Sequence, residues 1–312
     1  MIEKSKRLAP KIFITGLGGQ LGLAFKDLLG EHAVLLGRGQ LNLESPKEVR
    51  DKILELQPDI LINAAAYTKV DQAEREEELA YKINAESPFE MAKACHEVGA
   101  SFVSYSTDYV YSGTGDTAWK ETDPVSPQNA YGRGKAHGER LILDWAPPSF
   151  RFLIFRTSWV YSHIGKNFVL TMLKLGAERD ELKIVCDQIG SPTYAPDLAK
   201  YSFEAIKTLH AASAGASQNL RGVYNCCAQG ETSWFDFAKA IFLKAEQDNF
   251  GLRIRHVLPI KSAEYPTPAI RPLNSKMCQE KLELSFGIRL PHWKVALDQC
   301  FWQIERLKGV QS

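Results

Sequence analysis

The residues best suited to acid–base chemistry are Tyr131 and Lys135, in a Tyr-x-x-x-Lys pattern that also contains Gly132 and Gly134. Positions four apart on a helix share one face, so the phenol and the ammonium can act on the same bound group. A free tyrosine has a pKa of about 10, and a neighbouring lysine cation lowers that pKa toward the neutral range. The pattern predicts a proton-transfer pair. The alternative is a tyrosine packed on its helix beside an ordinary surface lysine.

Three polar residues, Ser106, Thr107 and Asp108, end a run at 101–106 that predicts a buried strand. Polar side chains at the carboxyl end of a parallel strand point into the crevice where ligands bind. Their position just ahead of Tyr131 in the chain strengthens its interpretation as a catalytic residue. The alternative is a simple turn, which the same composition fits.

A glycine triplet follows the first predicted strand, Lys11–Thr15. Gly16, Gly19 and Gly22 have the G-x-x-G-x-x-G spacing, and a helical pattern runs over 21–29. Gly16 permits the sharp turn, Gly19 lets the backbone approach a ligand, and Gly22 lets the helix pack closely on the sheet. The helix N-terminus then presents free N–H groups to a pyrophosphate. This arrangement predicts dinucleotide binding, whereas a flexible glycine turn is the alternative.

Arg38 follows the second predicted strand, 33–36, about 20 residues after the glycines. An acidic residue at this place binds the ribose hydroxyls of NAD, and an arginine accommodates a 2′-phosphate. No Asp or Glu occupies the strand end, so NADP(H) is favoured and NAD(H) remains possible. The alternative is a solvated surface arginine.

The elements that position these residues alternate along the chain. Buried apolar runs predict strands at 11–15, 33–36, 59–66, 101–106, 152–156, 182–186 and 222–226. Helical patterns fall at 21–29, 46–56, 73–84, 88–98, 131–144, 167–175, 197–209, 233–247 and 293–307. The order predicts an α/β fold with a Rossmann-type doubly wound parallel sheet and a smaller α+β substrate lobe. We expect 1–157 to form the NADP-binding domain, elements from about 194–228 to return to it, and 158–193 and 229–312 to form mainly the smaller lobe.

The composition is ordinary for a globular protein. Of the 312 residues, 45% are hydrophobic and 24% charged, with a net charge of +1, so we expect no nucleic-acid partner and no membrane association. The first ten residues lack an apolar core, so no signal peptide is expected. The six cysteines show no Cys-x-x-Cys pair, which favours reduced thiols in a cytoplasmic protein over a disulfide framework or a zinc site.

Together these motifs resemble the extended short-chain dehydrogenase/reductases, and within them the dTDP-4-dehydrorhamnose reductases. The similarity spans about 11–275, in the same order, through the segments 63–71 (NAAAYTKVD), 106–110 (STDYV), 156–161 (RTSWVY), 165–168 (GKNF), 187–193 (DQIGSPT) and 271–275 (RPLNS). The resemblance implies hydride delivery from NAD(P)H to the C4 ketone of a dTDP-6-deoxy-4-ketohexose. The product that the resemblance implies is dTDP-L-rhamnose, a precursor of cell-surface polysaccharides.

The resemblance also implies roles for individual residues. Tyr131 protonates the C4 oxygen, Lys135 holds the nicotinamide ribose and tunes the phenol, and Thr107 hydrogen-bonds the ketone. The cofactor residues it implies are Gly16, Gly19, Gln20, Leu21, Gly22, Arg38, Asn42, Leu43, Ala65, Ala66 and Tyr67, with Tyr131 and Lys135. The substrate residues are Thr107, Asp108, Trp159, Asn167 and Arg271, with Arg271 assigned to the diphosphate. Burial in the core is the alternative for Trp159, and a surface ion pair for Arg271.

One position separates this chain from the dehydratases of the superfamily, which carry a Glu after the Thr-Asp as the base that removes the C5 proton. Tyr109 stands there instead, so simple ketone reduction is preferred. Two alternatives stay open: reduction of another dTDP-4-keto-6-deoxysugar, and a non-catalytic NADP-binding subunit that resembles the regulatory β subunit of methionine adenosyltransferase.

Some reductases of this family bind Mg²⁺ through carboxylates at a dimer contact. The segment Tyr194–Asp197 offers a single acid, so no metal is predicted. The assembly is expected to be a monomer or a homodimer.

Overall fold

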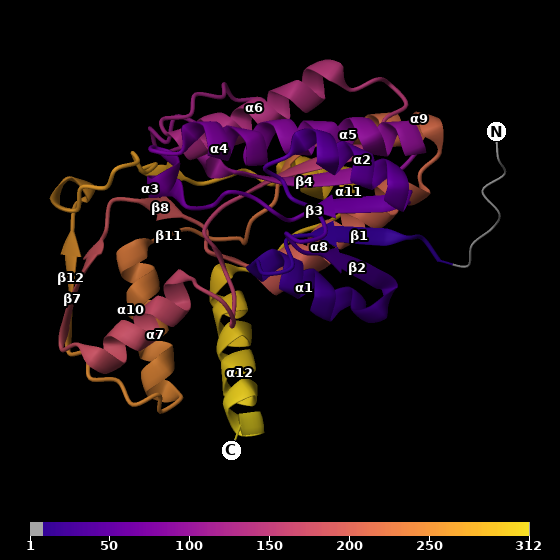
Figure 1. Cartoon of the computed structure of the whole chain (residues 1–312). Helices are drawn as coiled ribbons and strands as arrows, with labels where there is room; N and C mark the ends of the chain where they lie inside the picture. The colour runs from indigo at the N-terminus through magenta and orange to yellow at the C-terminus, as the bar shows by residue number, and fades with distance from the viewer. Residues whose placement is uncertain (1–8, 312) are drawn as a thin grey trace.

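A single parallel sheet organises the larger part of the molecule (Figure 1). The computed structural model describes residues 9–311, and the side chains of 9–307; the prediction that no signal peptide is present falls almost wholly outside them. The sheet has six strands in the order β10-β5-β4-β3-β1-β2, and every pair is parallel. The strands are β1 (Ile12–Thr15), β2 (Ala33–Leu36), β3 (Ile60–Asn63), β4 (Ser101–Thr107), β5 (Phe152–Thr157) and β10 (Gly222–Asn225).

Helices cover both faces of this sheet, which explains why its strands are apolar on both sides. One face carries α2 (Pro46–Leu56), α5 (Ser87–Val98) and α6 (Ala130–Trp145), and the other carries α1 (Gln20–Leu29), α8 (Ala195–Ala211) and α11 (Glu280–Phe286) (Figure 1). Within β1, Ile12 and Ile14 belong to one core, whereas Phe13 belongs to the other. The predicted Rossmann-type doubly wound sheet is therefore confirmed.

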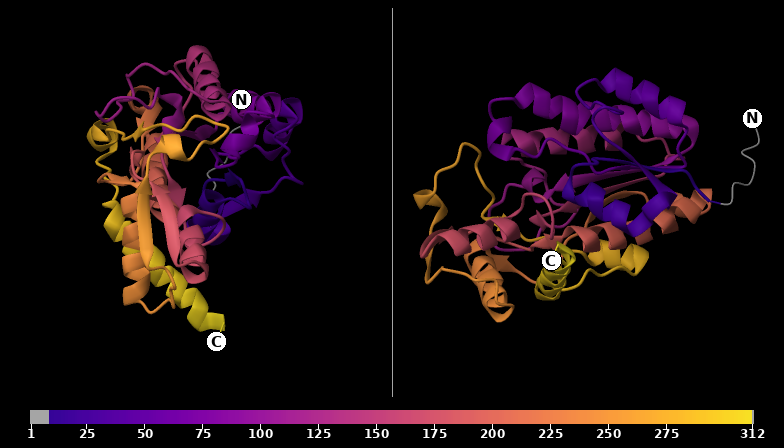
Figure 2. Two further views of the ribbon diagram at one scale, coloured as in Figure 1. Left: turned by 90° about the vertical axis from the view of Figure 1, so that its left-hand side faces the viewer. Right: turned by 60° about the horizontal axis from the view of Figure 1, so that its bottom comes forward.

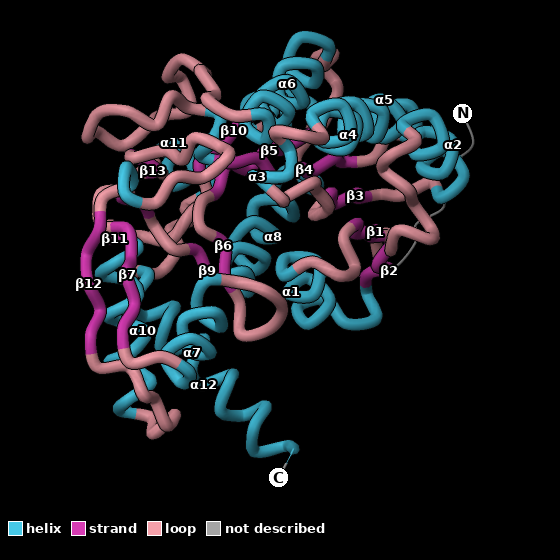
Figure 3. Tube along the Cα trace, turned by 60° about the vertical axis from the view of Figure 1, so that its left-hand side comes forward, coloured by secondary structure: helices cyan, strands magenta, loops and turns pink. Residues whose placement is uncertain are grey.

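Most of the remaining elements form a smaller body beside the carboxyl edge of the sheet (Figures 2 and 3). Its helices are α7 (Phe168–Glu178), α10 (Trp234–Gln247) and α12 (Trp293–Gln311), packed around a separate apolar core. Short strands complete it: β7 (Glu181–Val185) pairs with β12 (His256–Ile260), β6 (Val160–Tyr161) with β9 (Thr193–Tyr194), and β8 (Ile189–Gly190) with β11 (Thr232–Ser233) and β13 (Asn274–Ser275).

Late segments of the chain also contribute to the large sheet. Strand β10 pairs with β5, and α8 packs against α1. From within 229–312, α11 contacts β10, and Leu282 joins the core beneath the sheet. The short helix α9 (Ala214–Leu220) links α8 to β10. All six cysteines are free thiols.

The segment predicted as one helix over 73–84 is divided. It consists of α3 (Val70–Ala73), α4 (Glu77–Tyr81) and a π-helical turn (Lys82–Glu86) that runs directly into α5. Pro88 lies at the start of α5 without breaking the chain of helices, because the wider π turn shifts the hydrogen-bonding frame just where proline lacks an N–H.

Strand β12 and helix α11 were missed in the sequence. Pro259 lies inside β12, which pairs only with β7. A proline is tolerated in such an edge position because one side of the strand needs no partner. The pattern of prolines around 259–272 therefore concealed a strand.

Candidate active site

The turn between β1 and α1 needs its glycines. Gly16 has φ +91°, and a Cβ there would lie 2.9 Å from the carbonyl oxygen of Ala64. A Cβ on Gly22 would lie 2.1 Å from the carbonyl oxygen of Gly16, so Gly22 lets α1 approach the turn itself. Helix α1 begins at Gln20 with no side-chain cap. Its first N–H groups and the positive end of its dipole are thus available to an anionic ligand.

This turn lies at the switch point of the sheet. Strand β2 flanks β1 on one side and β3 on the other, so the connections leave in opposite directions and open a crevice at the strand ends. Thr15 ties the two loops together, since its hydroxyl donates to Asn63 Oδ1 (2.7 Å) and accepts from the N–H of Ala65 (3.2 Å). The crevice is therefore held by the ends of β1 and β3.

One end of the crevice is a hollow of about 360 Å³. Seven of the predicted cofactor residues line it: Gly16, Arg38, Asn42, Leu43, Ala65, Ala66 and Tyr67. Arg38 is three-quarters exposed and pairs with Glu44, a partner the sequence analysis did not identify. A guanidinium at the mouth of this hollow suits a ribose phosphate. Together with the glycine turn, these residues fit a dinucleotide that carries a 2′-phosphate.

The crevice continues into a cleft of about 850 Å³, lined by Thr107, Tyr131 and Lys135 and by Gln20 and Leu21 of the glycine turn. Tyr131 and Lys135 share one face of α6, as predicted. The structure thus brings the three predicted catalytic residues together on the wall of the cleft that continues from the glycine turn.

The start of α6 is fixed against the end of β4. Asn129 caps the helix, since its Oδ1 accepts the N–H of Gly132 at 2.8 Å. A Cβ on Gly132 would lie 2.3 Å from the carbonyl oxygen of Tyr109. The glycine after Tyr131 therefore permits the close contact that places the phenol beside Thr107.

Burial dominates the electrostatics of the pair. It lowers the pKa of Lys135 to about 8, against the opposing effect of Glu139, and the ammonium donates to the carbonyl oxygen of Tyr105 (2.8 Å). Burial raises the pKa of Tyr131, and its hydrogen bond with Thr107 only partly offsets this. The expectation that Lys135 lowers the pKa of Tyr131 was therefore wrong for this structure. A phenol that keeps its proton at neutral pH suits a proton donor.

Asp108 links Thr107 to the smaller body. The Thr107 hydroxyl donates to Asp108 Oδ1 (3.0 Å), and Ser275 donates to Asp108 Oδ2. Asp108 is buried, and this raises the pKa of its carboxyl to about 6. Its side chain serves as a bridge between the end of β4 and β13.

Trp159 lines the same cleft in a strained conformation. Its φ is +49°, rare for a bulky residue, and its indole stacks on Trp234 with ring centroids 3.6 Å apart. Such outliers cluster at functional sites. Trp159 is half-buried, so it is neither free nor simply a core residue.

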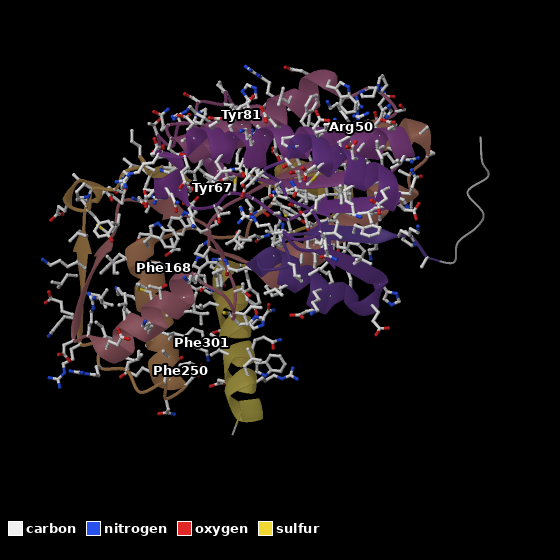
Figure 4. The ribbon with its side chains drawn as sticks, viewed as in Figure 1. Arg50, Tyr67, Tyr81, Phe168, Phe250 and Phe301 are labelled. Carbon is white, nitrogen blue, oxygen red and sulfur yellow. The ribbon has the colours of Figure 1, made fainter. Side chains whose placement is uncertain are left out.

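Arg271 lies in a second pocket, of about 880 Å³, which borders the smaller body. Its guanidinium pairs with Asp71 (2.7 Å) and donates to the phenol oxygen of Tyr109 (3.2 Å). The walls of this pocket include aromatic, aliphatic and basic side chains, namely Phe168, Met172, Leu175, Trp234, Tyr265, Arg179 and Lys183. Figure 4 labels Phe168, at the start of α7, and Tyr67, in the loop after β3.

Asn167 lines neither cleft. It caps α7, since its Oδ1 accepts the N–H of Leu170 (3.1 Å) and its Nδ2 donates to the carbonyl oxygens of Ser162 (2.7 Å) and Ile164 (3.1 Å). The amide is fully engaged by local structure, and the structure therefore gives Asn167 a capping role.

Sequence reasoning assigned no role to three further residues. Asp71 positions Arg271, Ser275 holds Asp108, and Asn84 both donates to the carbonyl oxygen of Tyr67 (3.0 Å) and accepts its N–H (2.9 Å). Asp71 and Ser275 end two of the segments that carry the family resemblance, which was the available signal. Nothing in the local sequence marks Asn84, because its position depends on the π turn.

The described residues hold no cluster of three or more His, Cys, Asp or Glu side chains arranged for a metal ion. In the same part of the chain, no helix combines the length and apolar character needed to cross a membrane.

A glycine turn at the switch point of a parallel sheet, followed by a Tyr-x-x-x-Lys helix, defines the class of extended short-chain dehydrogenase/reductases. A model of one family, described as the RmlD substrate binding domain, matches residues 10–306. The chain is 43% identical over 292 residues to dTDP-4-dehydrorhamnose reductase of Salmonella typhimurium, covering 92% of this chain and 95% of that protein.

Solved structures agree. A dTDP-4-dehydrorhamnose reductase from Clostridium acetobutylicum matches with a TM-score of 0.84 and 37% identity, over 95% of this chain and 99% of that one. The Bacillus anthracis reductase, solved in complex with NADP, matches with a TM-score of 0.84 and 36% identity, over 95% and 100%. The chain therefore belongs to the dTDP-4-dehydrorhamnose reductase family. Its assignment to an oxidoreductase family is confirmed. The predicted cofactor, NADP(H), agrees with the NADP bound in the Bacillus anthracis structure.

Proposed function

We propose that this protein uses NADPH to reduce the C4 ketone of dTDP-4-dehydro-L-rhamnose to dTDP-L-rhamnose, with Tyr131 as the general acid. The observation that carries the proposal is the meeting of Thr107, Tyr131 and Lys135 on the wall of the cleft that continues from the glycine turn. Relatives about 40% identical over most of the chain are dTDP-4-dehydrorhamnose reductases, which supports the choice of substrate.

The dinucleotide is held by backbone groups of 16–21, with Arg38 at the 2′-phosphate and Lys135 at the nicotinamide ribose. When bound, NADPH supplies the hydride. Tyr131 gives its proton to the C4 oxygen. The Thr107 hydroxyl, which donates to Asp108 in the structure, turns to donate a hydrogen bond to the same oxygen as negative charge develops there. Because burial raises the pKa of Tyr131, the phenol enters the reaction in its proton-bearing form.

The substrate extends from this cleft into the pocket that contains Arg271. Its guanidinium provides a planar fork for the diphosphate, and the apolar wall formed by Phe168, Trp234 and Tyr265 suits the nucleoside. Trp159 and Asp108 lie on the path between the two ends and contact the sugar. This assignment gives each predicted substrate residue except Asn167 a place along one ligand.

The test is NADPH oxidation with dTDP-4-dehydro-L-rhamnose and with other dTDP-4-keto-6-deoxysugars. If the protein prefers another of these sugars, that sugar replaces dTDP-4-dehydro-L-rhamnose as the proposed substrate. Absence of turnover with every sugar, in protein that still binds NADPH, would favour the regulatory-subunit alternative.

Tyr131→Phe tests the acid. We expect turnover to fall by about 10²–10⁴-fold, the usual contribution of a positioned proton donor, while NADPH binding is retained. Tyr81→Phe is the matched control, because Tyr81 packs on His137 outside both clefts and is expected to leave turnover unchanged. Full activity in Tyr131→Phe would refute the assignment.

A further inference from the structure

A buried ion pair between Arg156 and Glu139 lies behind the cleft wall that carries Tyr131 and Lys135. Arg156 and Glu139 are only 3% and 4% exposed, and the guanidinium approaches both carboxylate oxygens, with Nη2–Oε2 at 2.5 Å and Nε–Oε1 at 3.0 Å. Arg156 also donates to the phenol oxygen of Tyr111 (2.8 Å). Removing two charges from water costs several kcal/mol each, so such a pair calls for an explanation beyond stability.

The pair joins two of the elements that line the cleft, α6 and β5. Glu139 lies on α6 one turn after Lys135, and Arg156 lies on β5 just before the segment 157–159 that lines the cleft. Lys135 and Glu139 both line one small internal cavity of about 10 Å³, with Asn84 and Ser106. Glu139 is therefore fixed by a partner on another element, one helical turn from Lys135 and at a cavity that both side chains line.

Two charged groups near Lys135 are Glu139, one turn away on α6, and the Arg156 guanidinium that is bound to it. From β4, Tyr105 offers a backbone carbonyl oxygen, while its phenol is engaged with Ser202. The π turn offers the neutral Asn84 to the shared cavity. Burial lowers the pKa of Lys135, and the negative charge of Glu139 raises it.

Other ionisable groups near α6 face elsewhere. From the 3₁₀ turn after β4, Asp108 is engaged by Thr107 and Ser275. On the outer side of α6, carboxylates bond to its N-terminal turn: Glu74 accepts the N–H of Ala130, and Glu77 pairs with Arg133. His137 packs on Tyr81 of α4.

We propose that Glu139, fixed by Arg156, is a positioning residue of the active site whose carboxylate keeps the buried Lys135 side chain in its ammonium form. The inference deepens the proposed function and rests on the role given there to Lys135. Without Glu139, burial acts unopposed on the ammonium, and Lys135 loses its proton at a lower pH.

The test measures the titration of Lys135 directly, in the full chain labelled with ¹³Cε-lysine, with the signal assigned by its loss in Lys135→Met. In the wild type the midpoint is expected at about 8. Glu139→Gln is expected to lower it by about one pH unit or more. Glu77→Gln is the matched control: it also removes a carboxylate paired with α6, at Arg133 only two residues from Lys135, but on the exposed side, and is expected to leave the midpoint unchanged.

This experiment needs no substrate, so it decides the inference even if the proposed function fails. An unchanged midpoint in folded Glu139→Gln would overturn the inference. Where the unpaired Arg156 prevents folding, the double variant Glu139→Leu/Arg156→Met removes both charges, a replacement that buried pairs often tolerate; its midpoint is also expected below the wild-type value, and an unchanged one would overturn the inference.

The kinetic counterpart is the alkaline limb of kcat for NADPH oxidation. It is expected to move to lower pH in Glu139→Gln and to stay in place in Glu77→Gln. A role limited to stability would lower the melting temperature of Glu139→Gln without moving this limb.

Discussion

The two halves of the proposed active site, one for the cofactor and one for the substrate, are built in different ways. The cofactor half consists of backbone at the ends of β1 and β3, where glycines, a helix N-terminus and the Thr15–Asn63 hydrogen bond define the shape. The substrate half is assembled from side chains that are far apart in sequence. Asp71 and Arg271, for example, are 200 residues apart in the chain, yet Arg271 Nη2 lies 2.7 Å from Asp71 Oδ2. The first half is shaped mainly by backbone at the ends of two adjacent strands, whereas the second depends on the docking of the smaller body.

This difference implies that damage to the two halves has different consequences. A change in the glycine turn alters the fold of β1 and α1, and so affects stability and cofactor together. A change in the substrate pocket removes one contact and leaves the sheet intact. Three substitutions test this contrast.

The largest effect is expected for Gly22→Ala. A Cβ there would lie 2.1 Å from the carbonyl oxygen of Gly16, so α1 must move away from the turn. We expect a loss of about 3 kcal/mol in the free energy of unfolding, at the upper end for overpacking, measured by urea denaturation. Gly18→Ala is the control, because no atom lies within 4 Å of its added Cβ. Equal stability of the two variants would show that the close approach is not needed.

An intermediate effect is expected for Arg271→Ala. Loss of a charged hydrogen bond to the diphosphate costs about 1.5–3 kcal/mol, so KM for the nucleotide sugar should rise about 10- to 100-fold while the Kd for NADPH is unchanged. Arg289→Ala removes a comparable ion pair, with Glu283, outside both clefts, and is expected to change neither constant. A weakened affinity for NADPH in Arg271→Ala would contradict the separation of the two halves.

The smallest effect is expected for Arg38→Ala. The side chain is 75% exposed, and solvent screens its interaction with a phosphate. We expect the Kd for NADPH to rise about three- to fivefold, and the Kd for NADH to stay the same, by fluorescence titration. Arg50→Ala, on α2 and paired with Glu97, is the control. Equal losses for the two dinucleotides would exclude a phosphate contact at Arg38.

The same contrast explains what the sequence could predict. The strand–glycine–helix unit and the Tyr131–Lys135 spacing depend on periodicity and on neighbours within a few residues, so their geometry was predictable. The raised pKa of Tyr131 was not, because it comes from burial of the phenol, which depends on how the chain packs around it. Asp71 as the partner of Arg271, and the capping of α7 by Asn167, depend on how loops meet in space. The family resemblance alone pointed to the substrate pocket.

The π turn at Lys82–Glu86 has one further consequence. Its extra residue rotates Asn84 so that the amide pairs with both backbone groups of Tyr67, as a neighbouring strand would. The same residue meets α6, since a Cβ on Gly138 would lie 2.5 Å from the carbonyl oxygen of Asn84. Deleting one residue here would restore a regular helix and turn the apolar side of α5 away from the sheet by about 100°. The π turn therefore fixes the position of the loop at Tyr67 relative to helix α6.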